Sequence, residues 1–439
     1  MKVIGLDTGT TTISAVVLDL DADSVLDSRT IPNGSHLSSP NEWEHIQNAD
    51  SVVTRARAVL DKLLELHPDT ARIGLTGQMH GMVYTDEEGR SVSPLYTWQD
   101  QRAGLKRDGD DPRSVVDRLR EDFGLSASAG FGAVTHAWHT ENGSVPSQAV
   151  SFCTIPDYLG MYLTGRKRPL QHISMAASMG CFDIWKKAFE KEALSKFGVD
   201  VSLLPEVTDK FAVLGEYRGI PVTAAAGDNQ ASFLGSAGLE ENTVLLNIGT
   251  GGQISVLVPE IVQSRDIECR PLTADHYLAV GSSLCGGRAY AILEKFFRLY
   301  AAGPGGEAEP QYDRMIAMAL DEMPLSDPPL VSTTFNGSRS DPSLKGSILN
   351  LTEDNFTPGN LVYGVLCGIC GELHGMFEQV QEKTGLSIRS LVGSGNGLRK
   401  NGILQRIASE QFGAQLVMSR YVEEAACGAA KSSVMDMDK

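Results

Sequence analysis

Two short turns in the sequence combine glycine with hydroxyl side chains, a composition that suits phosphate binding. The first, Asp7–Thr12, sets an aspartate beside a glycine and a row of threonines, and the second, Asn247–Gly252, lies in the other half of the chain. Glycine lets the backbone approach an anion closely, while amides and hydroxyls donate hydrogen bonds to it. We therefore expect a triphosphate to be bound by Thr8, Gly9, Thr10, Thr11, Gly249, Thr250 and Gly251.

A plain β-hairpin turn is the alternative for each segment, because Asp, Thr and Gly are common in turns for local reasons. The recurrence of the pattern favours phosphate binding over that alternative. Neither segment is a P-loop, since a P-loop ends in Gly-Lys-Ser/Thr and opens a helix. If the first turn binds phosphate, Asp7 would face Mg²⁺, usually through water.

A third glycine-rich segment, Gly393–Gly397, does not fit the dinucleotide pattern, because Leu398 stands where the third glycine is required. A glycine-rich turn that enters a helix could instead pack against the flat face of an adenine, with asparagine amides as hydrogen-bonding groups. The residues predicted for this part of the nucleotide site are Gly393, Gly395, Asn396 and Asn401.

Both phosphate turns are expected to join two strands, because each lies between apolar runs, at 3–6 and 12–18 and within 243–258. The other predicted elements are strands at 25–31, 72–76, 278–281 and 389–392, helices at 41–67, 286–301, 310–323, 360–383 and 400–412, and a loop at 335–351. The second half thus repeats the plan of the first. A mixed α/β protein follows, with two similar lobes at 1–218 and 219–439 that meet in the short stretch Arg218–Pro221.

The bulk composition excludes several classes of protein. A net charge of −17 over 439 residues argues against a nucleic-acid partner, which needs a basic surface. No apolar run is long enough to span a membrane, and the early Asp7 argues against a secretory signal, so we expect a cytoplasmic protein. The seven scattered cysteines indicate reduced thiols, and Cys367 and Cys370 read as small core residues rather than zinc ligands.

A set of motifs, in this order along the chain, resembles the FGGY family of carbohydrate kinases. The matching segments are Gly5–Thr11, Gly77–Gly81, Trp98–Arg102, Asp157–Leu159, Gly227–Gln230, Asn247–Thr250, Gly393–Gly395 and Gly428–Ala430. The resemblance implies an actin-like ATPase (ribonuclease H-like) fold with the active site in a cleft between two similar lobes. It also implies ATP and Mg²⁺ as cofactors and a small sugar as substrate.

Within the family, four segments are most similar to sedoheptulokinases. They are Gly77–Gly81, Thr97–Asp100, Gly130–Gly132 and Ala176–Ser178. Xylulokinases share the Gln-Met-His-Gly stretch and are the nearest rival. The resemblance therefore implies phosphorylation of a ketose at a terminal hydroxyl, with sedoheptulose as the expected substrate and xylulose, another pentulose or a polyol as alternatives.

Transfer of a phosphoryl group to a sugar hydroxyl requires a carboxylate that accepts the alcohol proton. Asp228 is the predicted base and a second predicted metal ligand beside Asp7, because it lies in Ala225–Ala231, where a glycine precedes a helix start. An N-cap aspartate is the alternative from local sequence alone. The resemblance assigns Asp228 the catalytic role.

Sugar recognition requires directional donors and acceptors, because a polyol is distinguished by the geometry of its hydroxyls. The predicted sugar-binding residues are Gln78, Met79, His80, Trp98, Asp100, Arg102 and Asn229. Two of them have a structural alternative: a lone histidine at a strand end is often a hydrogen-bonded core residue, and Arg102 could pair with Asp100.

The chain departs from the family pattern at Thr135, Ile173 and Ser338, where the family has a lysine, an aspartate and a glutamate. These departures leave both phosphate turns and Asp228 intact, so they bear on substrate identity more than on phosphoryl transfer. A non-catalytic actin-like sensor of sugar or nucleotide is the alternative from another class. The retained Asp228 favours the enzyme. A homodimer is possible, as for many soluble proteins.

Overall fold

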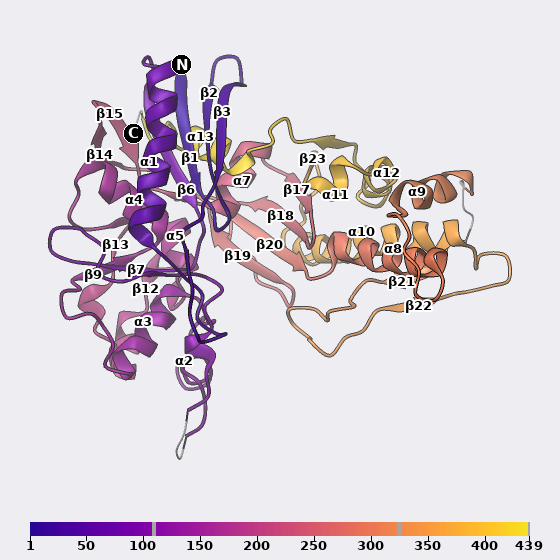
Figure 1. Cartoon of the computed structure of the whole chain (residues 1–439), viewed down its shortest axis with the longest axis horizontal. Coiled ribbons are helices and arrows are strands. Elements are labelled where there is room, and N and C mark those ends of the chain that lie inside the picture. The colour runs from indigo at the N-terminus through magenta and orange to yellow at the C-terminus, as the bar shows by residue number, and fades with distance from the viewer. Residues whose placement is uncertain (108–110, 323–326, 438–439) are drawn as a thin grey trace. The chain divides into compact units, whose positions relative to one another are not determined.

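The structure is a computed structural model that describes residues 1–107, 111–322 and 327–437 (Figure 1). The chain forms two compact units. Unit 1 comprises residues 1–238, 271–275 and 421–439, and unit 2 comprises residues 239–270 and 276–420. Each unit is built around its own mixed β-sheet.

The central sheet of unit 1 has the strand order β14-β15-β6-β1-β2-β3, and β16 also pairs with β6. Its strands are β1 (Lys2–Thr8), β2 (Thr12–Asp19), β3 (Ser24–Pro32), β6 (Arg72–Gly77), β14 (Val213–Tyr217), β15 (Ile220–Thr223) and β16 (Ala226–Gly227). The first three strands form an antiparallel meander, whereas β6 is parallel to β1 and β16 is parallel to β6. The first phosphate turn is therefore the tip of the β1–β2 hairpin.

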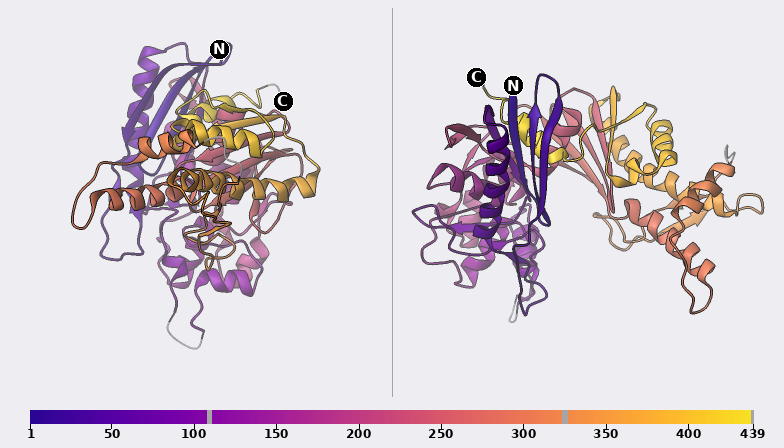
Figure 2. Two further views of the ribbon diagram at one scale, coloured as in Figure 1. Left: turned by 90° about the vertical axis from the view of Figure 1, so that its right-hand side faces the viewer. Right: turned by 45° about the horizontal axis from the view of Figure 1, so that its top comes forward.

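Helices α1 (Ala49–Leu66) and α13 (Glu424–Ser432) cover opposite faces of this sheet, as Figure 2 also shows. The sheet separates two cores, because alternate side chains of a strand point to opposite faces. Ile4 and Leu6 pack toward α1, whereas Val3 packs toward α13. Asn48 caps α1 by accepting a hydrogen bond from the Ser51 amide at 2.8 Å. The predicted start of this helix near Asn41 is wrong, because residues 46–47 form a short strand instead.

Helix α13 lies directly on the sheet because the two strands beneath it carry glycine at the same level. Gly5 of β1 and Gly74 of β6 are paired in register. A Cβ atom on Gly5 would lie 1.8 Å from the Ala426 carbonyl oxygen, and one on Gly74 would lie 1.8 Å from the Ala429 carbonyl oxygen. Any side chain at either position would therefore push the helix away from the sheet.

The remainder of unit 1 consists of small sheets and short helices around a second core that includes Tyr84, Phe152 and Met179. The elements that frame the site residues are β7 (Val83–Thr85), β8 (Leu95–Tyr96), β9 (Ser151–Cys153), β10 (Leu170–His172), β13 (Glu206–Thr208), α3 (Gly132–Glu141), α4 (Ile155–Thr164), α5 (Ile173–Ser178) and α7 (Asp228–Ala237). The others are β4 (His36–Leu37), β5 (Ile46–Gln47), β11 (Phe182–Asp183), β12 (Ala188–Phe189), α2 (Val115–Glu121) and α6 (Lys191–Phe197), with one-turn helices at 102–104 and 201–203.

The sheet of unit 2 repeats the plan of unit 1. Its order is β19-β20-β18-β17-β23-β24, with β17 antiparallel to β18 and parallel to β23. The elements are β17 (Thr243–Ile248), β18 (Gly252–Val258), β19 (Ile267–Pro271), β20 (Tyr277–Ser283), β21 (Leu330–Ser332), β22 (Ser347–Leu349), β23 (Ser390–Ser394), β24 (Leu416–Met418), α8 (Gly286–Ala302), α9 (Tyr312–Asp321), α10 (Pro358–Thr384), α11 (Asn396–Arg399) and α12 (Gly402–Gln411). The predicted strands and helices of this half are found close to their expected positions, and the predicted helix end at Met323 lies outside the described residues.

The division into units differs from the expected boundary at residue 219. Strands β15 and β16 pair with β6, and α7 packs against α13, so residues 219–238 fold with unit 1. Gly235 and Gly428 allow this helix contact, since a Cβ on Gly428 would lie 1.7 Å from the Ala231 carbonyl oxygen. The last helix, α13, also belongs to unit 1, because it packs against α7 and against strands β1 and β6. Sequence order alone does not indicate this.

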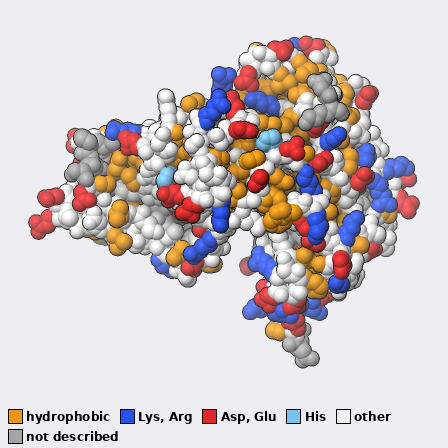
Figure 3. Space-filling view, turned by 180° about the vertical axis from the view of Figure 1, so that it is seen from behind, with side chains coloured by type: hydrophobic (Ala, Val, Ile, Leu, Met, Phe, Trp, Pro, Cys, Tyr) orange, Lys and Arg blue, Asp and Glu red, His pale blue; other side chains and the backbone are white. Residues whose placement is uncertain are grey.

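All seven cysteines are free, and Cys370 is fully buried beside the partly buried Cys367. Within the described ranges, no helix is long and apolar enough to cross a membrane. Figure 3 shows basic and acidic side chains interspersed over the face that it presents.

Candidate active site

The two predicted metal-facing aspartates of unit 1 lie at strand ends on opposite sides of β6. Asp7 of β1 is in register with Thr76, while Gly227 of β16 is in register with Gly77. Asp228 follows Gly227 directly. Because both flanking strands are parallel to β6, the two aspartates lie at the same edge of the sheet, where the carboxyl ends of its parallel strands meet.

Asp228 is the first residue of α7 and is partly buried. Gly227 occupies the N-cap position of this helix, and no side chain caps it. The N-cap alternative is therefore not how the structure uses Asp228. A carboxylate in the first helical turn is stabilised by the positive end of the helix dipole. The neighbouring Asn229 has an amide oxygen that is buried and has no hydrogen-bond partner among the described residues.

The surroundings of the Asp7 carboxyl group are suited to binding a cation. Burial, followed by the charges of Asp228 and Glu423, raises the pKa of Asp7 to about 7. Its buried Oδ1 atom has no hydrogen-bond partner among the described residues. No group of three or more metal-ligating side chains occurs in those residues. Mg²⁺ is often held by one or two carboxylates together with substrate phosphates, so this donor set fits that ion.

The first turn is held by hydrogen bonds that leave part of it exposed. The Thr8 hydroxyl is buried and donates to the Thr76 carbonyl at 3.2 Å, and the Gly9 carbonyl accepts from the Asn33 side-chain amide at 2.8 Å. The Thr10 hydroxyl accepts a hydrogen bond from the Trp98 indole at 3.0 Å. Thr11 is exposed. Thr8 therefore shapes the turn through its side chain, while the residues after it are accessible to a ligand.

The structure brings most of the predicted sugar-binding residues to the carboxyl end of β6, which is continuous with the first turn. The Gln78 amide nitrogen donates to the Thr8 carbonyl at 3.0 Å, and its buried side chain donates to Gln47 at 3.0 Å. Trp98 is 45% exposed and can offer its face to sugar C–H groups. Met79 is buried and packs below Gly227, since a Cβ there would lie 2.9 Å from the Met79 sulfur. Met79 thus acts through packing.

His80 has a strained backbone with φ of 72°, which non-glycine residues seldom adopt. Ser178 fixes this conformation: its hydroxyl accepts from the His80 amide at 3.1 Å, and its carbonyl oxygen lies 2.6 Å from His80 Nδ1. The imidazole also stacks on Phe131 with ring centroids 4.5 Å apart. Strain held by several contacts is common at functional sites.

Asp100 and Arg102 form a buried ion pair rather than an accessible pair of ligand groups. Arg102 donates through Nε and Nη2 to the two carboxylate oxygens at 2.7 and 3.0 Å and also pairs with Glu44 at 2.9 Å. Its guanidinium lies over the Tyr96 ring, 4.2 Å from the centroid. Asp100 is 0% exposed. The structural alternative for Arg102 describes this geometry, and the pair holds the Trp98 loop in place.

The second phosphate turn belongs to unit 2, at the tip of the β17–β18 hairpin. The first turn of α8 closes against it: the amides of Gly287 and Arg288 donate to the carbonyls of Gly249 and Thr250 at 2.9 Å each. A cavity of about 720 Å³ opens beside the turn and is lined by the predicted residues Gly249, Thr250, Asn396 and Asn401. The structure thus gathers these four residues into one pocket within unit 2.

The other predicted nucleotide residues of unit 2, Gly251, Gly393 and Gly395, do not line this cavity. Gly395 has φ of 84°, and a Cβ there would lie 2.6 Å from the Ile248 carbonyl oxygen. Sequence reasoning missed Arg288, Tyr290 and Lys400, which line the cavity. The Gly286-Gly287 pair before Arg288 was an available signal, because two glycines after a strand permit close contact with the turn.

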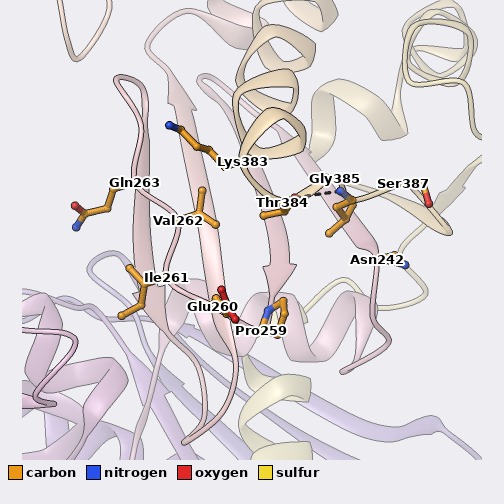
Figure 4. Close-up of a pocket in the computed structure, with 11 residues that line it drawn as sticks. Asn242, Pro259, Glu260, Ile261, Val262, Gln263, Lys383, Thr384, Gly385 and Ser387 are labelled. Carbon is orange, nitrogen blue, oxygen red and sulfur yellow. Dashed lines mark hydrogen bonds between the residues drawn. The ribbon is translucent and has the colours of Figure 1, made fainter.

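A second cavity of unit 2, of about 690 Å³, is shown in Figure 4. Its lining includes Asn242, which precedes β17, and Pro259, which follows β18. It therefore lies at the end of the sheet opposite the phosphate turn. None of the predicted site residues lines it.

The three departures from the family pattern are two buried residues of unit 1 and one loop residue of unit 2. Thr135 and Ile173 are each 1% exposed, and Ile173 packs in the second core of unit 1. The Ser338 hydroxyl accepts a hydrogen bond from the Asp341 amide at 3.0 Å in a loop of unit 2.

Comparison with known families agrees with this geometry. Residues 2–235 match the N-terminal domain of the FGGY family of carbohydrate kinases, and residues 244–437 match its C-terminal domain. The chain belongs to this family and has its actin-like ATPase fold with two domains. It is a carbohydrate kinase, a class of enzyme that transfers a phosphoryl group to a sugar, which implies ATP as the donor.

Among individual proteins, the chain is 28% identical to the sedoheptulokinase of Mus musculus over 97% of its own length and 96% of that protein. It is 27% identical to the sedoheptulokinase of Homo sapiens with the same coverage. The crystal structure of a xylulose kinase from Rhodospirillum rubrum superposes with a TM-score of 0.81 at 24% identity, covering 98% of this chain and 90% of that one.

Proposed function

We propose that this carbohydrate kinase uses ATP and Mg²⁺ to phosphorylate sedoheptulose at its terminal hydroxyl, giving sedoheptulose 7-phosphate. The observation that carries the choice of sugar is the similarity to two sedoheptulokinases over nearly the whole chain. The choice of chemistry is supported by the position of Asp228 at the start of α7, at the sheet edge that also carries Asp7.

In this proposal, Asp228 accepts the proton of the terminal hydroxyl as its oxygen forms a bond to the γ-phosphorus. The bond between that phosphorus and the β,γ-bridging oxygen breaks, and ADP leaves. Mg²⁺, when held through Asp7 and Asp228, would neutralise charge on the phosphate oxygens. The exposed donors of the first turn and the hydroxyl of Thr250 bind phosphate oxygens, while the cavity of unit 2 holds the adenosine.

Gln78, His80, Trp98 and Asn229 are proposed to orient the sugar. Gln78 and His80 are fixed by Gln47 and Ser178, so their polar groups are already positioned before the sugar binds. Preorganised hydrogen-bonding groups discriminate among hydroxyl arrangements more sharply than mobile ones. Asp100 and Arg102 act on the sugar indirectly, by holding the segment that carries Trp98.

The test is a coupled ADP-release assay with Mg²⁺ and a panel of C5 to C7 ketoses and polyols. We expect the highest kcat/KM for sedoheptulose and a product with the mass of a heptulose monophosphate. Turnover of xylulose, ribulose or a polyol with none on sedoheptulose would reassign the substrate and leave the kinase chemistry intact.

A further inference from the structure

The backbone before Asp228 is held by a buried serine on a different helix. The Gly227 amide donates a hydrogen bond to the Ser174 hydroxyl oxygen at 3.0 Å, and both residues are buried. Gly227 is the N-cap of α7, so its amide has no carbonyl partner within the helix. Ser174 therefore satisfies a buried donor of the Ala226–Gly227 peptide group, one residue before Asp228.

The Ser174 hydroxyl is itself oriented by His172. Its oxygen lies 2.8 Å from His172 Nδ1, and the Ser174 amide also donates to Nδ1, at 3.3 Å. Since the Ser174 amide donates to Nδ1, that nitrogen is an acceptor that carries no proton, and the hydroxyl proton of Ser174 points to it. Burial lowers the pKa of His172 to about 3, in keeping with this neutral form. The ring is fixed by stacking on Phe211 with centroids 4.1 Å apart.

Gly227 is confined on its other side as well. It is in register with Gly77 of β6, and Met79 packs so closely that a Cβ at Gly227 would lie 2.9 Å from its sulfur. With β6 and Met79 setting two directions, two hydrogen bonds set the plane of the Ala226–Gly227 peptide group: its amide donates to Ser174, and its carbonyl accepts from the Thr76 hydroxyl at 2.9 Å. The direction of the Asp228 carboxylate depends on that plane, because Asp228 begins the helix.

We propose that His172 and Ser174 are a positioning pair that aims the Asp228 carboxylate at the acceptor hydroxyl, through the chain His172 Nδ1, Ser174 Oγ and the Gly227 amide. The inference rests on the proposed function in one respect, that Asp228 is the base. A positioning pair acts on the chemical step, since displacing a catalytic group by a fraction of an ångström lowers the rate of transfer without removing contacts to substrate.

The first test compares Ser174→Ala with Ser174→Thr, which keeps the hydroxyl. We expect Ser174→Ala to lower kcat about 10-fold or more, with KM for sugar and ATP changed less than about 3-fold, and Ser174→Thr to recover most of the lost kcat. Ser151→Ala is the matched control, because the Ser151 hydroxyl is also buried and donates to a backbone carbonyl, that of Leu203 at 3.1 Å, away from α7. It should change kcat less than about 2-fold.

The second test addresses the histidine and does not depend on the folding of Ser174→Ala. His172→Asn places an amide oxygen near the position of Nδ1 and retains the N-cap of α5, whereas His172→Gln does not. We expect kcat to be higher in His172→Asn than in His172→Gln, at similar KM and thermal stability. Equal kcat in both variants would overturn the role of His172.

The inference is also overturned if Ser174→Ala folds and keeps more than about a third of kcat, or if Ser174→Thr loses as much kcat as Ser174→Ala. Asp228→Asn, measured in parallel, separates this failure from failure of the proposed base. If Asp228→Asn is inactive while Ser174→Ala is fully active, the positioning pair alone is wrong. If Asp228→Asn is active, the assignment of the base is wrong.

Discussion

Asp7, near the end of β1, and Asp228, just after β16, lie on the two sides of β6, and the charge of Asp228 is the second largest cause, after burial, of the raised pKa of Asp7. Two carboxylates that repel one another in a partly dry site are costly to keep ionised. A divalent cation removes that cost. The relationship therefore connects a feature of the sheet topology, two strands parallel to one central strand, with the metal dependence that we propose for the reaction.

Asp7→Asn should raise the Mg²⁺ concentration needed for half-maximal activity by about 10-fold or more, because one of two anionic groups facing the ion is lost. The KM for the sugar should change little. A Mg²⁺ titration of kcat in the variant and the wild type measures this. An unchanged Mg²⁺ requirement would show that Asp7 does not face the ion.

Thr250→Val should weaken nucleotide binding, because the hydroxyl at the exposed tip of the second turn is replaced by a methyl group of similar size. The loss of one hydrogen bond to a charged group corresponds to a Kd raised about 10-fold. Calorimetric titration with a non-hydrolysable ATP analogue measures it, with Thr250→Ser as the control that keeps the hydroxyl. Equal affinity in the valine variant would contradict the assignment of this turn to phosphate.

Buried histidines of unit 1 should make the fold acid-sensitive. Burial lowers the pKa of His136 to about 4, from an ordinary value of 6.5. The unfolded chain then binds more protons between these values, so stability that is present above pH 6.5 is lost as the pH falls toward 4. The shift corresponds to about 3 kcal/mol, from roughly 2.5 pKa units at about 1.36 kcal/mol each.

His136→Asn removes this titration while its amide oxygen can still accept from the Tyr84 hydroxyl, which lies 2.7 Å from His136 Nδ1. Denaturant unfolding at pH 7.5 and pH 4.5 should show a smaller loss of stability in the variant than in the wild type. Part of the loss of stability at low pH should remain in the variant, because burial also lowers the pKa values of His139 and His172 to about 3. An identical pH dependence in both proteins would refute the contribution of His136.

Gly5→Ala should destabilise the protein by about 3 kcal/mol or more, because the new methyl group would overlap the backbone of α13. Gly375→Ala is the control. It lies within α10, and a Cβ there would meet nothing within 4 Å. That substitution should be neutral or stabilise slightly, as alanine favours helix over glycine. Thermal unfolding of both variants decides the matter, and similar melting temperatures would contradict the close approach of α13.

The sequence was sufficient to predict the local elements of the site. Apolar runs on either side of a threonine and glycine turn indicate a hairpin, and both hairpins are present at the expected positions. Local sequence patterns could not reveal which polar side chains the fold buries. Asp100 and Arg102 are polar and adjacent to an accessible tryptophan, yet long-range contacts with Glu44 and Tyr96 remove them from solvent.

Other features of the fold and site could not be predicted from the sequence because they depend on contacts between distant segments. The final helix belongs to unit 1 because Gly5 and Gly74 lie side by side on neighbouring strands, a fact that depends on register. The contact of Ser174 with Gly227 joins residues 53 positions apart and has no local signal. Patterns of period two or 3.6 report the elements, whereas such contacts depend on how the elements pair.

Replacement of the proposed base tests the account most directly. In Asp228→Asn, turnover of sugar in the ADP-release assay should fall by about 10² to 10⁴-fold, while the affinity for an ATP analogue stays within about 3-fold of the wild type. This result would place Asp228 in the proton-transfer step. Retention of more than about a tenth of kcat in a folded variant would contradict general-base catalysis by Asp228.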